Sequence, residues 1–266
     1  MEKVYIFGHQ KPDTDSITSA ISLSYLKNKL GMHTVPARLG EINDETKYVL
    51  KYFNVATPMF IEDVKLQLKD LNYHKDYFIN QNVSIKQAYD YMTEKGITGI
   101  PVVDDNKKFV GLVTVKTIFK DLINGDFGYL HTSYNNILNT LEGEEVLKVD
   151  EEITGNLMAA AYRSATIINN VPLEKNHILI VGDRYSVIEY AIMSKVKLLI
   201  VVGNGEINEE HLNLARENHV NIIRTKFDTF HTTKVIGLAN YLKNVIPSDR
   251  PYTFDEGTYY DDFVVK

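Results

Sequence analysis

The chain opens with short apolar runs that alternate with amphipathic stretches, and this rhythm restricts the fold more than any other feature. Val4–Phe7 is an apolar run that ends at a glycine, and Thr14–Leu30 places apolar residues at helical spacing. His33–Pro36 then leads into a second short strand, and Glu45–Phe53 is typical of a second helix. The order strand, helix, strand, helix predicts a parallel sheet with helices on its faces, an α/β fold.

Two further groups of elements follow this start. The first group is a compact unit, and we expect it to contain helix Ser84–Lys95, strand Ile100–Val103, turn Asp104–Lys107, strand Phe109–Thr114 and helix Val115–Leu122. The alternation of strands and helices then returns, with expected helix Asn135–Leu141, strand Glu145–Val149, helix Gly155–Ser164, strand His177–Val181, helix Ser186–Lys195, strand Lys197–Val202, helix Glu209–Glu217, strand Asn221–Arg224 and helix Thr232–Leu242. The second group predicts another α/β domain.

Composition excludes several classes of protein. The net charge of −6 argues against a nucleic-acid-binding face, which is usually basic. Cysteine is absent, so a disulfide framework and a thiolate metal site are excluded, and a reducing cytoplasm is expected. The first residues are not typical of a signal peptide, and the longest apolar run, which starts at Leu198, is too short to span a membrane.

One imidazole and two carboxylates gather in the turn after the first strand. His9, Asp13 and Asp15 follow the apolar run directly, at the strand end where open α/β sheets usually bind ligands. One nitrogen and several carboxylate oxygens suit Mn²⁺, Mg²⁺ or Co²⁺, and such sites hydrolyse phosphoanhydrides. The alternative is that the two aspartates are ordinary turn and helix-capping residues.

The full string from Gly8 to Phe53 resembles the N-terminus of the family II inorganic pyrophosphatases, which belong to the DHH phosphoesterases. The resemblance covers about residues 3–63, and it implies a Mn²⁺-dependent hydrolase of inorganic diphosphate, with Co²⁺ or Mg²⁺ as other possible ions. It also implies that His9 and Asp13 bind one Mn²⁺ and that Asp15 binds the second. Arg38 and Gly40, in "PARLG", match a family string whose role the sequence does not give.

The middle unit resembles a CBS domain through "ITGIPVVDDNKKFVGLVTVKTIFKDLI". The resemblance implies an adenine and ribose pocket formed by the backbone at Thr98, Gly99, Ile100 and Pro101, with hydroxyl contacts from Thr114 and Thr117 and a phosphate contact from Lys116. Position 117 holds threonine where many CBS domains hold a ribose-binding aspartate. The alternative is that Thr114 and Lys116 only end a strand and begin a helix.

The next unit resembles a DRTGG domain through "HILIVGDRYSVIEYAIMSKVKLLIVVGNGEI". In its relatives this domain is an α/β spacer and a dimer contact, so a structural role is preferred. The tail "PYTFDEGTYYDDFVVK" resembles the start of a second CBS repeat. The predicted domains are a partial DHH (Rossmann-like) parallel-sheet segment at 1–66, a CBS domain at 67–125, a DRTGG domain at 126–248 and a truncated CBS repeat at 249–266.

This layout resembles the nucleotide-regulated pyrophosphatases. It implies AMP, ADP, ATP or diadenosine polyphosphates as regulators and a homodimer formed through the CBS and DRTGG domains. The DHH triplet and the substrate-binding C-terminal domain of that family are missing, so a truncated or split enzyme without its complete catalytic site is expected. Asp150, Asp183 and Asp228 belong to other units and do not supply the missing ligands. The alternative function is an adenine-nucleotide-sensing CBS–DRTGG module without catalytic activity.

Overall fold

The computed structural model describes residues 3–125 and 128–264, which form two compact units. His74–Tyr252 form one unit, and the described residues before and after it form the other. Among the described residues, none of the helices combines the length and the apolar character that crossing a bilayer requires. Each unit is described by itself below.

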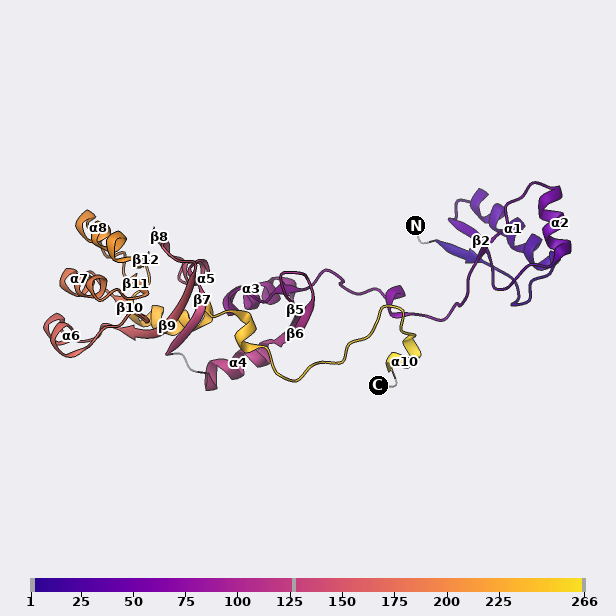
Figure 1. The fold of residues 1–266 in the computed structure, drawn as a ribbon. Coiled ribbons are helices and arrows are strands. Elements are labelled where there is room, and N and C mark those ends of the chain that lie inside the picture. Colours follow the sequence, from indigo (N-terminus) through magenta and orange to yellow (C-terminus); the bar gives the residue numbers. More distant parts are fainter. Residues whose placement is uncertain (1–2, 126–127, 265–266) are drawn as a thin grey trace. The chain divides into compact units, whose positions relative to one another are not determined.

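The unit that contains the N-terminal residues begins with a parallel α/β layer, drawn in indigo and purple in Figure 1. Its elements are β1 (Val4–Ile6), α1 (Thr14–Lys29), β2 (Thr34–Arg38), α2 (Asp44–Tyr52) and β3 (Met59–Phe60). Strand β2 lies between β1 and β3 and is parallel to both. Asp13 caps α1 and Asn43 caps α2, because each side chain accepts a hydrogen bond from a backbone N–H of the first turn.

The unit formed by His74–Tyr252 begins with the CBS-like part. Its elements are β4 (Ile79–Asn80), α3 (Ile85–Lys95), β5 (Gly99–Val103), β6 (Phe109–Thr114) and α4 (Val115–Asn124). Strand β5 pairs in parallel with β4 and in antiparallel with β6, and Asp104–Lys107 form the turn that joins β5 to β6. Buried Ile85, Met92, Ile100 and Val113 form the centre of its core.

The DRTGG-like part is a sheet with helices on both faces. Its elements are β7 (Tyr129–Ser133), α5 (Tyr134–Thr140), β8 (Glu144–Leu147), β9 (Glu152–Ala159), α6 (Ser164–Asn170), β10 (His177–Val181), α7 (Tyr185–Met193), β11 (Leu198–Val201), α8 (Glu209–Asn218), β12 (Asn221–Arg224), α9 (Thr229–Val235) and the 3₁₀ helix η2 (Ile236–Ala239). Strands β9, β10, β11 and β12 run parallel in this order, and β7 and β8 are antiparallel at the two edges. One apolar cluster joins the sheet to α6, α7 and α8, and a second joins it to α5 and η2.

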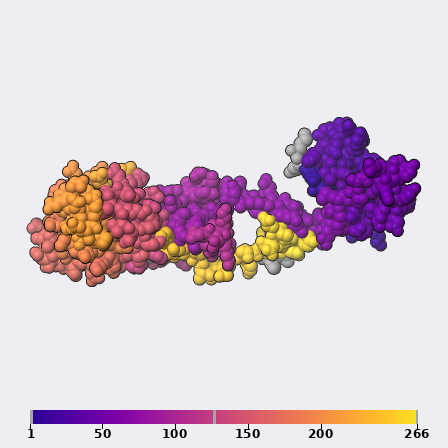
Figure 2. All heavy atoms as spheres, turned by 45° about the horizontal axis from the view of Figure 1, so that its top comes forward, coloured from indigo at the N-terminus to yellow at the C-terminus, as the bar shows by residue number. Residues whose placement is uncertain are grey.

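The chain after the DRTGG-like part returns to the CBS-like part. The 3₁₀ helix η3 (Leu242–Val245) places Leu242 and Val245 in the CBS-like core. Its backbone N–H groups at Leu242 and Lys243 donate to the carbonyls of Val83 and Gln81. Figure 2 shows this yellow segment packed against the purple and magenta atoms of the CBS-like part. A segment far away in the sequence therefore completes the CBS-like core.

In the other unit, the tail pairs with the segment that follows β3. The 3₁₀ helix η1 (Leu68–Asp70) donates hydrogen bonds from Leu68 and Lys69 to Thr258 and Glu256, and helix α10 (Tyr260–Val264) follows directly. Tyr260 donates in return to the carbonyl of Leu66.

Two sequence-based expectations were wrong. The region Gly155–Ser164, expected to be helical, belongs to strand β9 as far as Ala159. Ile153 and Gly155 are buried on alternate positions, and a Cβ at residue 155 would lie 2.0 Å from the carbonyl oxygen of Asn176, so pairing with the neighbouring strands overrides helix propensity. The helix expected over Thr232–Leu242 ends at Val235 and continues only as 3₁₀ turns.

Candidate functional sites

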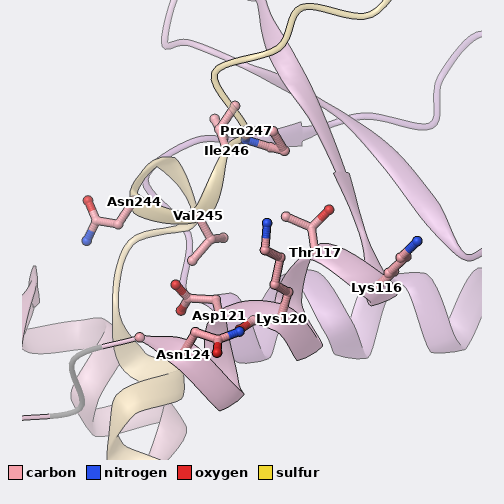
Figure 3. Close-up of a pocket in the computed structure, with 10 residues that line it drawn as sticks. Lys116, Thr117, Lys120, Asp121, Asn124, Asn244, Val245, Ile246 and Pro247 are labelled. Atoms are coloured by element: carbon pink, nitrogen blue, oxygen red, sulfur yellow. The ribbon is translucent and has the colours of Figure 1, made fainter.

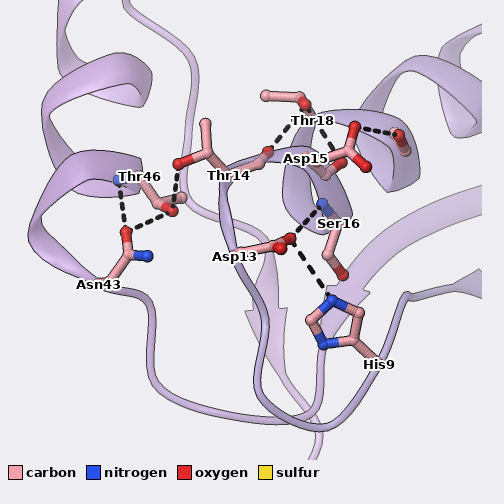
Figure 4. A network of polar contacts seen from close by, with 9 residues as sticks. His9, Asp13, Thr14, Asp15, Ser16, Thr18, Asn43 and Thr46 are labelled. Atoms are coloured by element: carbon pink, nitrogen blue, oxygen red, sulfur yellow. Dashed lines mark hydrogen bonds and ion pairs between the residues drawn. The ribbon is translucent and has the colours of Figure 1, made fainter.

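The first candidate site is the loop that joins β1 to α1. His9 Nε2 lies 3.5 Å from Asp13 Oδ1, and both side chains are 58% exposed (Figure 4). The backbone N–H of Ser16 donates to Asp13 Oδ1 at 2.8 Å. This hydrogen bond is the largest cause that lowers the pKa of the Asp13 carboxyl, and the nearby His9 adds to it. Asp13 is thus held as a carboxylate facing the imidazole.

Asp15 lies in the first turn of α1 but does not join this pair. Ser19 Oγ donates to Asp15 Oδ1 at 3.4 Å, and Figure 4 shows the carboxylate on the side of Thr18, away from His9. Asp15 and His9 line one cavity of about 240 Å³ together with Gly8 and Ser16. Within the described ranges, no three histidine, aspartate or glutamate side chains lie close enough to share a metal ion.

Gly8 and Gly40 hold this loop close to its neighbours. A Cβ at residue 8 would lie 1.9 Å from Ser16 Oγ, and a Cβ at residue 40 would lie 2.3 Å from the carbonyl oxygen of Gln10. Arg38 fixes the second contact, because its Nη1 donates to the carbonyl of Gly40 at 2.7 Å. Arg38 and Gly40, which had no role in the sequence analysis, therefore position the loop that carries His9 and Asp13.

The donor set of this loop fits a divalent cation in its chemistry. An imidazole nitrogen and a carboxylate oxygen already face each other, and Ser16 Oγ is buried beside them without a hydrogen-bond partner. The N-terminal end of α1 favours negative charge here and so stabilises the carboxylates as ligands. Asp15, which the resemblance assigns to a second ion, accepts a hydrogen bond from Ser19 Oγ instead of facing His9 and Asp13.

The second candidate site is a cavity of about 400 Å³ in the second unit, between α4 and the segment Asn244–Pro247 (Figure 3). Lys116, Thr117, Lys120, Asp121 and Asn124 line it from α4. Thr117 and Lys116, two of the residues expected to bind a nucleotide, thus lie in one cavity. The other residues of that set lie outside its lining.

Those other residues have structural contacts. Thr114 Oγ1 caps α4 by accepting a hydrogen bond from the backbone N–H of Thr117 at 3.1 Å. Ile100 is fully buried in the core, Gly99 pairs with Thr114 and Pro101 pairs with Leu112. The Thr98 carbonyl accepts a hydrogen bond from Val115. They position the start of α4, from which the side chains that line the cavity project.

Sequence reasoning missed Lys120, Asp121, Asn124 and the whole segment Asn244–Pro247. The helical spacing of four residues from Lys116 and Thr117 would have found the first two. The segment 244–247 carries no comparable signal, because it reaches the cavity through tertiary packing of η3.

Comparisons with known proteins agree with this architecture. A family model for the CBS domain matches residues 68–124, and one for the DRTGG domain matches residues 136–239. The crystal structure of the CBS and DRTGG domains of the regulatory region of Clostridium perfringens pyrophosphatase, complexed with the activator diadenosine tetraphosphate, matches with a TM-score of 0.66. It is 27% identical, and the match covers 76% of this chain and 89% of that one. The expected α/β fold class with CBS and DRTGG domains is confirmed.

Curated relatives extend the similarity to the N-terminal part. A cobalt-dependent inorganic pyrophosphatase of Clostridium perfringens is 34% identical over 88% of this chain and 43% of its own length. A probable manganese-dependent inorganic pyrophosphatase of Thermotoga maritima is 30% identical over 90% of this chain and 44% of its own length. The chain spans less than half the length of these relatives. The chain is thus a homologue of the manganese- and cobalt-dependent inorganic pyrophosphatases and carries a CBS domain and a DRTGG domain.

Proposed function

We propose that this chain senses adenine nucleotides through its CBS domain and thereby regulates a metal-dependent inorganic pyrophosphatase activity. AMP, ADP, ATP or a diadenosine polyphosphate would bind in the cavity between α4 and Asn244–Pro247. The observation that carries the proposal is the agreement between this cavity, with two lysines and an apolar wall, and a matched regulatory region that was solved with diadenosine tetraphosphate. Inorganic diphosphate would be the substrate of the regulated activity.

His9 and Asp13 would hold one metal ion of that activity and Asp15 a second, with Mn²⁺ or Co²⁺ as the expected ion. The names of the curated relatives and the donor set of the loop support this assignment. A bound ion would supply positive charge that stabilises the developing charge on a phosphate group. The chain itself keeps Asp13 ionised through the N–H of Ser16 and orients it towards the His9 ring.

The tail would be the start of a second CBS repeat. Two similar sets of backbone hydrogen bonds, one in each unit, support this. Gln67–Asp70 read QLKD and Tyr241–Asn244 read YLKN, and both segments begin 3₁₀ helices. The hydrogen bonds made by these segments correspond in order: Leu68 to Thr258, Lys69 to Glu256 and Tyr260 to Leu66 in one unit, and Leu242 to Val83, Lys243 to Gln81 and Ile85 to Asn240 in the other. In each set, the 3₁₀ helix at the start of one proposed repeat is bonded to the segment just before the first α-helix of the other repeat. The domain boundaries that we predicted remain a proposal on this basis.

The chain would also form a homodimer through its CBS and DRTGG domains. An apolar hollow of about 300 Å³ between α3 and α4 supports a contact of this kind on the CBS side. Its lining includes Tyr89 and Phe119, whose side chains are exposed in the chain alone. Exposed apolar patches of this kind often mark protein contacts.

Nucleotide binding is tested by thermal unfolding of the full chain with AMP, ADP, ATP and diadenosine tetraphosphate. A ligand that binds only the folded state raises the unfolding free energy by RT ln(1 + [L]/Kd), about 2.7 kcal/mol at a hundredfold excess over Kd. We expect Lys120→Glu to weaken binding about tenfold, because it places a negative charge beside a phosphate. Lys175→Glu, at an exposed position outside the cavity, is the matched control and should keep the shift. No shift with any of the four nucleotides at millimolar concentration would overturn the proposal.

A second candidate function is a nucleotide-sensing module without catalysis. It is favoured by the lack, within residues 3–125 and 128–264, of three metal-binding side chains that lie close enough together to share an ion. Phosphate release from diphosphate, measured with Mn²⁺ or Co²⁺ and with or without AMP, separates the two. Release that Asp13→Asn abolishes supports the pyrophosphatase. A nucleotide-dependent thermal shift without release supports the sensing module.

A further inference from the structure

A hollow of about 590 Å³ lies between α7 and α8 of the DRTGG domain and shares no lining residue with either candidate site. The two helices pack on the same face of the sheet, and one apolar cluster joins them to it (Figure 1). The side chains that matter below line this α7–α8 hollow from both helices: Glu189 and Met193 from α7, and Glu210, His211, Leu214 and Glu217 from α8.

Three carboxylates line the α7–α8 hollow without a counter-ion. Glu189, Glu210 and Glu217 are exposed, and within residues 3–125 and 128–264 none of them takes part in an ion pair or a side-chain hydrogen bond. Arg216, the arginine of α8, donates to Asn213 Oδ1 at 2.7 Å instead. Negative charge therefore gathers around the hollow without a cation bonded to it.

The helices themselves account for only one of these carboxylates. Glu210 lies in the first turn of α8, where the helix dipole favours negative charge. Glu217 lies one residue before the end of the same helix, where the dipole favours a cation, and Glu189 lies in the middle of α7. The charges at 189 and 217 are thus not stabilised by their own helices, and a cation in the hollow would offset their mutual repulsion.

His211 provides a second and independent indication of a ligand. It is only 7% exposed and is the buried member of the lining, so it forms the floor of the hollow. Tyr185 stacks on its ring at a centroid distance of 5.6 Å. Nδ1 is buried and has no hydrogen-bond partner, and among the described residues Nε2 has none either. Because Nε2 is not sealed off in this way and the ring lines the hollow, we place Nε2 towards it.

We propose that the α7–α8 hollow binds a linear polyamine, an aliphatic chain that carries several ammonium groups. An ammonium group is a cation with N–H donors, so it fits the carboxylates and also the Nε2 lone pair of the imidazole tautomer with hydrogen on Nδ1. Met193 and Leu214 offer an apolar surface to the methylene groups of the chain. A metal ion fits less well, since within the described ranges no three histidine or acidic side chains come close enough to share one.

The spacing of the carboxylates predicts the length of the ligand. Glu210 and Glu217 are two helical turns apart, about 10 Å along the axis of α8. The terminal ammonium groups of an extended triamine such as spermidine reach both carboxylates, and Glu189 on the opposite helix is left for the central nitrogen. The two ammonium groups of putrescine, a shorter diamine, do not span this separation. The site should therefore select polyamines by chain length.

The test is calorimetric titration of the full chain with spermidine and with putrescine in about 0.15 M salt, where exposed charges more than about 8 Å apart are largely screened. We expect spermidine to bind about tenfold more tightly, because it makes a further charge-assisted contact. Glu217→Gln keeps the size of the side chain and should weaken spermidine binding about tenfold, to within about twofold of putrescine. Glu209→Gln is the matched control, since it removes the same charge from an exposed position of α8 outside the lining, and it should keep the wild-type preference.

Mg²⁺ separates a specific site from general attraction of cations to an acidic surface. If Mg²⁺ displaces spermidine as effectively at an equal concentration of charge, or if Glu209→Gln weakens spermidine as much as Glu217→Gln does, the hollow attracts counter-ions only and the proposal is overturned. Equal affinities for spermidine and putrescine, or no binding of spermidine at millimolar concentration, would overturn it as well. The proposal does not depend on the nucleotide site, because the two linings have no residue in common.

Discussion

At the scale of single residues, the loop between β1 and α1 is shaped by close backbone contacts more than by its ionisable groups. Gly8 lies against Ser16 in the first turn of α1, and Gly40 lies against the backbone at Gln10. These contacts set the path of the chain on both sides of His9. The 3.5 Å approach of His9 to Asp13 therefore depends on residues that carry no functional group themselves.

Gly8→Ala should destabilise the first unit by roughly 1–3 kcal/mol, the usual effect of forcing a methyl group into a packed site. The new Cβ would lie 1.9 Å from Ser16 Oγ and 3.1 Å from Ser16 Cβ, so the Ser16 hydroxyl has to rotate and the loop has to shift slightly away from α1. Hydrogen exchange of the α1 amides measures the loss. Gly182→Ala is the matched control, since a Cβ there meets nothing within 4 Å. The double variant Gly8→Ala/Ser16→Ala should recover part of the stability, and a Gly8→Ala chain as stable as the control would contradict this account.

At the scale of elements, α4 links the fold of the CBS domain to its cavity. The helix begins where β6 ends, and Thr114 caps it through the N–H of Thr117. The same residue was expected from the sequence to contact a nucleotide. Thr114 does not line the cavity, but it caps the helix from which Thr117 and Asp121 project into it.

Thr114→Ala should cost about 1 kcal/mol of unfolding free energy through loss of the cap, and it should also weaken AMP binding. Thr114→Ser keeps the hydroxyl group and should restore both properties. Chemical unfolding and calorimetry measure the two effects on the same samples. If the alanine variant unfolds like wild type, the hydroxyl does not cap α4. If it loses stability but binds AMP normally, the cap does not position the cavity.

The sequence was sufficient for elements whose pattern is local. Strand Val4–Ile6, helix Thr14–Lys29 and the helix–strand–turn–strand–helix order of the CBS domain follow from periodicity and turn residues. Strand β9 was mistaken for a helix because only its neighbours in the sheet reveal its state. The same limit applies to the candidate site. Lys116 and Thr117 lie in a recognisable motif, whereas Val245 and Pro247 reach the cavity from a segment more than a hundred residues away.

At the scale of the whole molecule, the chain combines an N-terminal parallel α/β layer with a CBS–DRTGG unit, and its similarity to inorganic pyrophosphatases covers both. The CBS domain is not continuous in sequence, since η3 completes its core after the whole DRTGG domain. The DRTGG domain is therefore anchored to the CBS domain at both of its ends. This arrangement places the wall of the cavity, Asn244–Pro247, directly beyond the DRTGG domain along the chain.

Hydrogen–deuterium exchange of the full chain with and without saturating AMP tests the central claim most directly, because it locates the ligand without a substitution. We predict slower exchange in peptides that cover α4 and residues 242–247, with little change across α8 and β12. AMP binding that leaves α4 and residues 242–247 unprotected, or protection confined to the DRTGG helices, would contradict it.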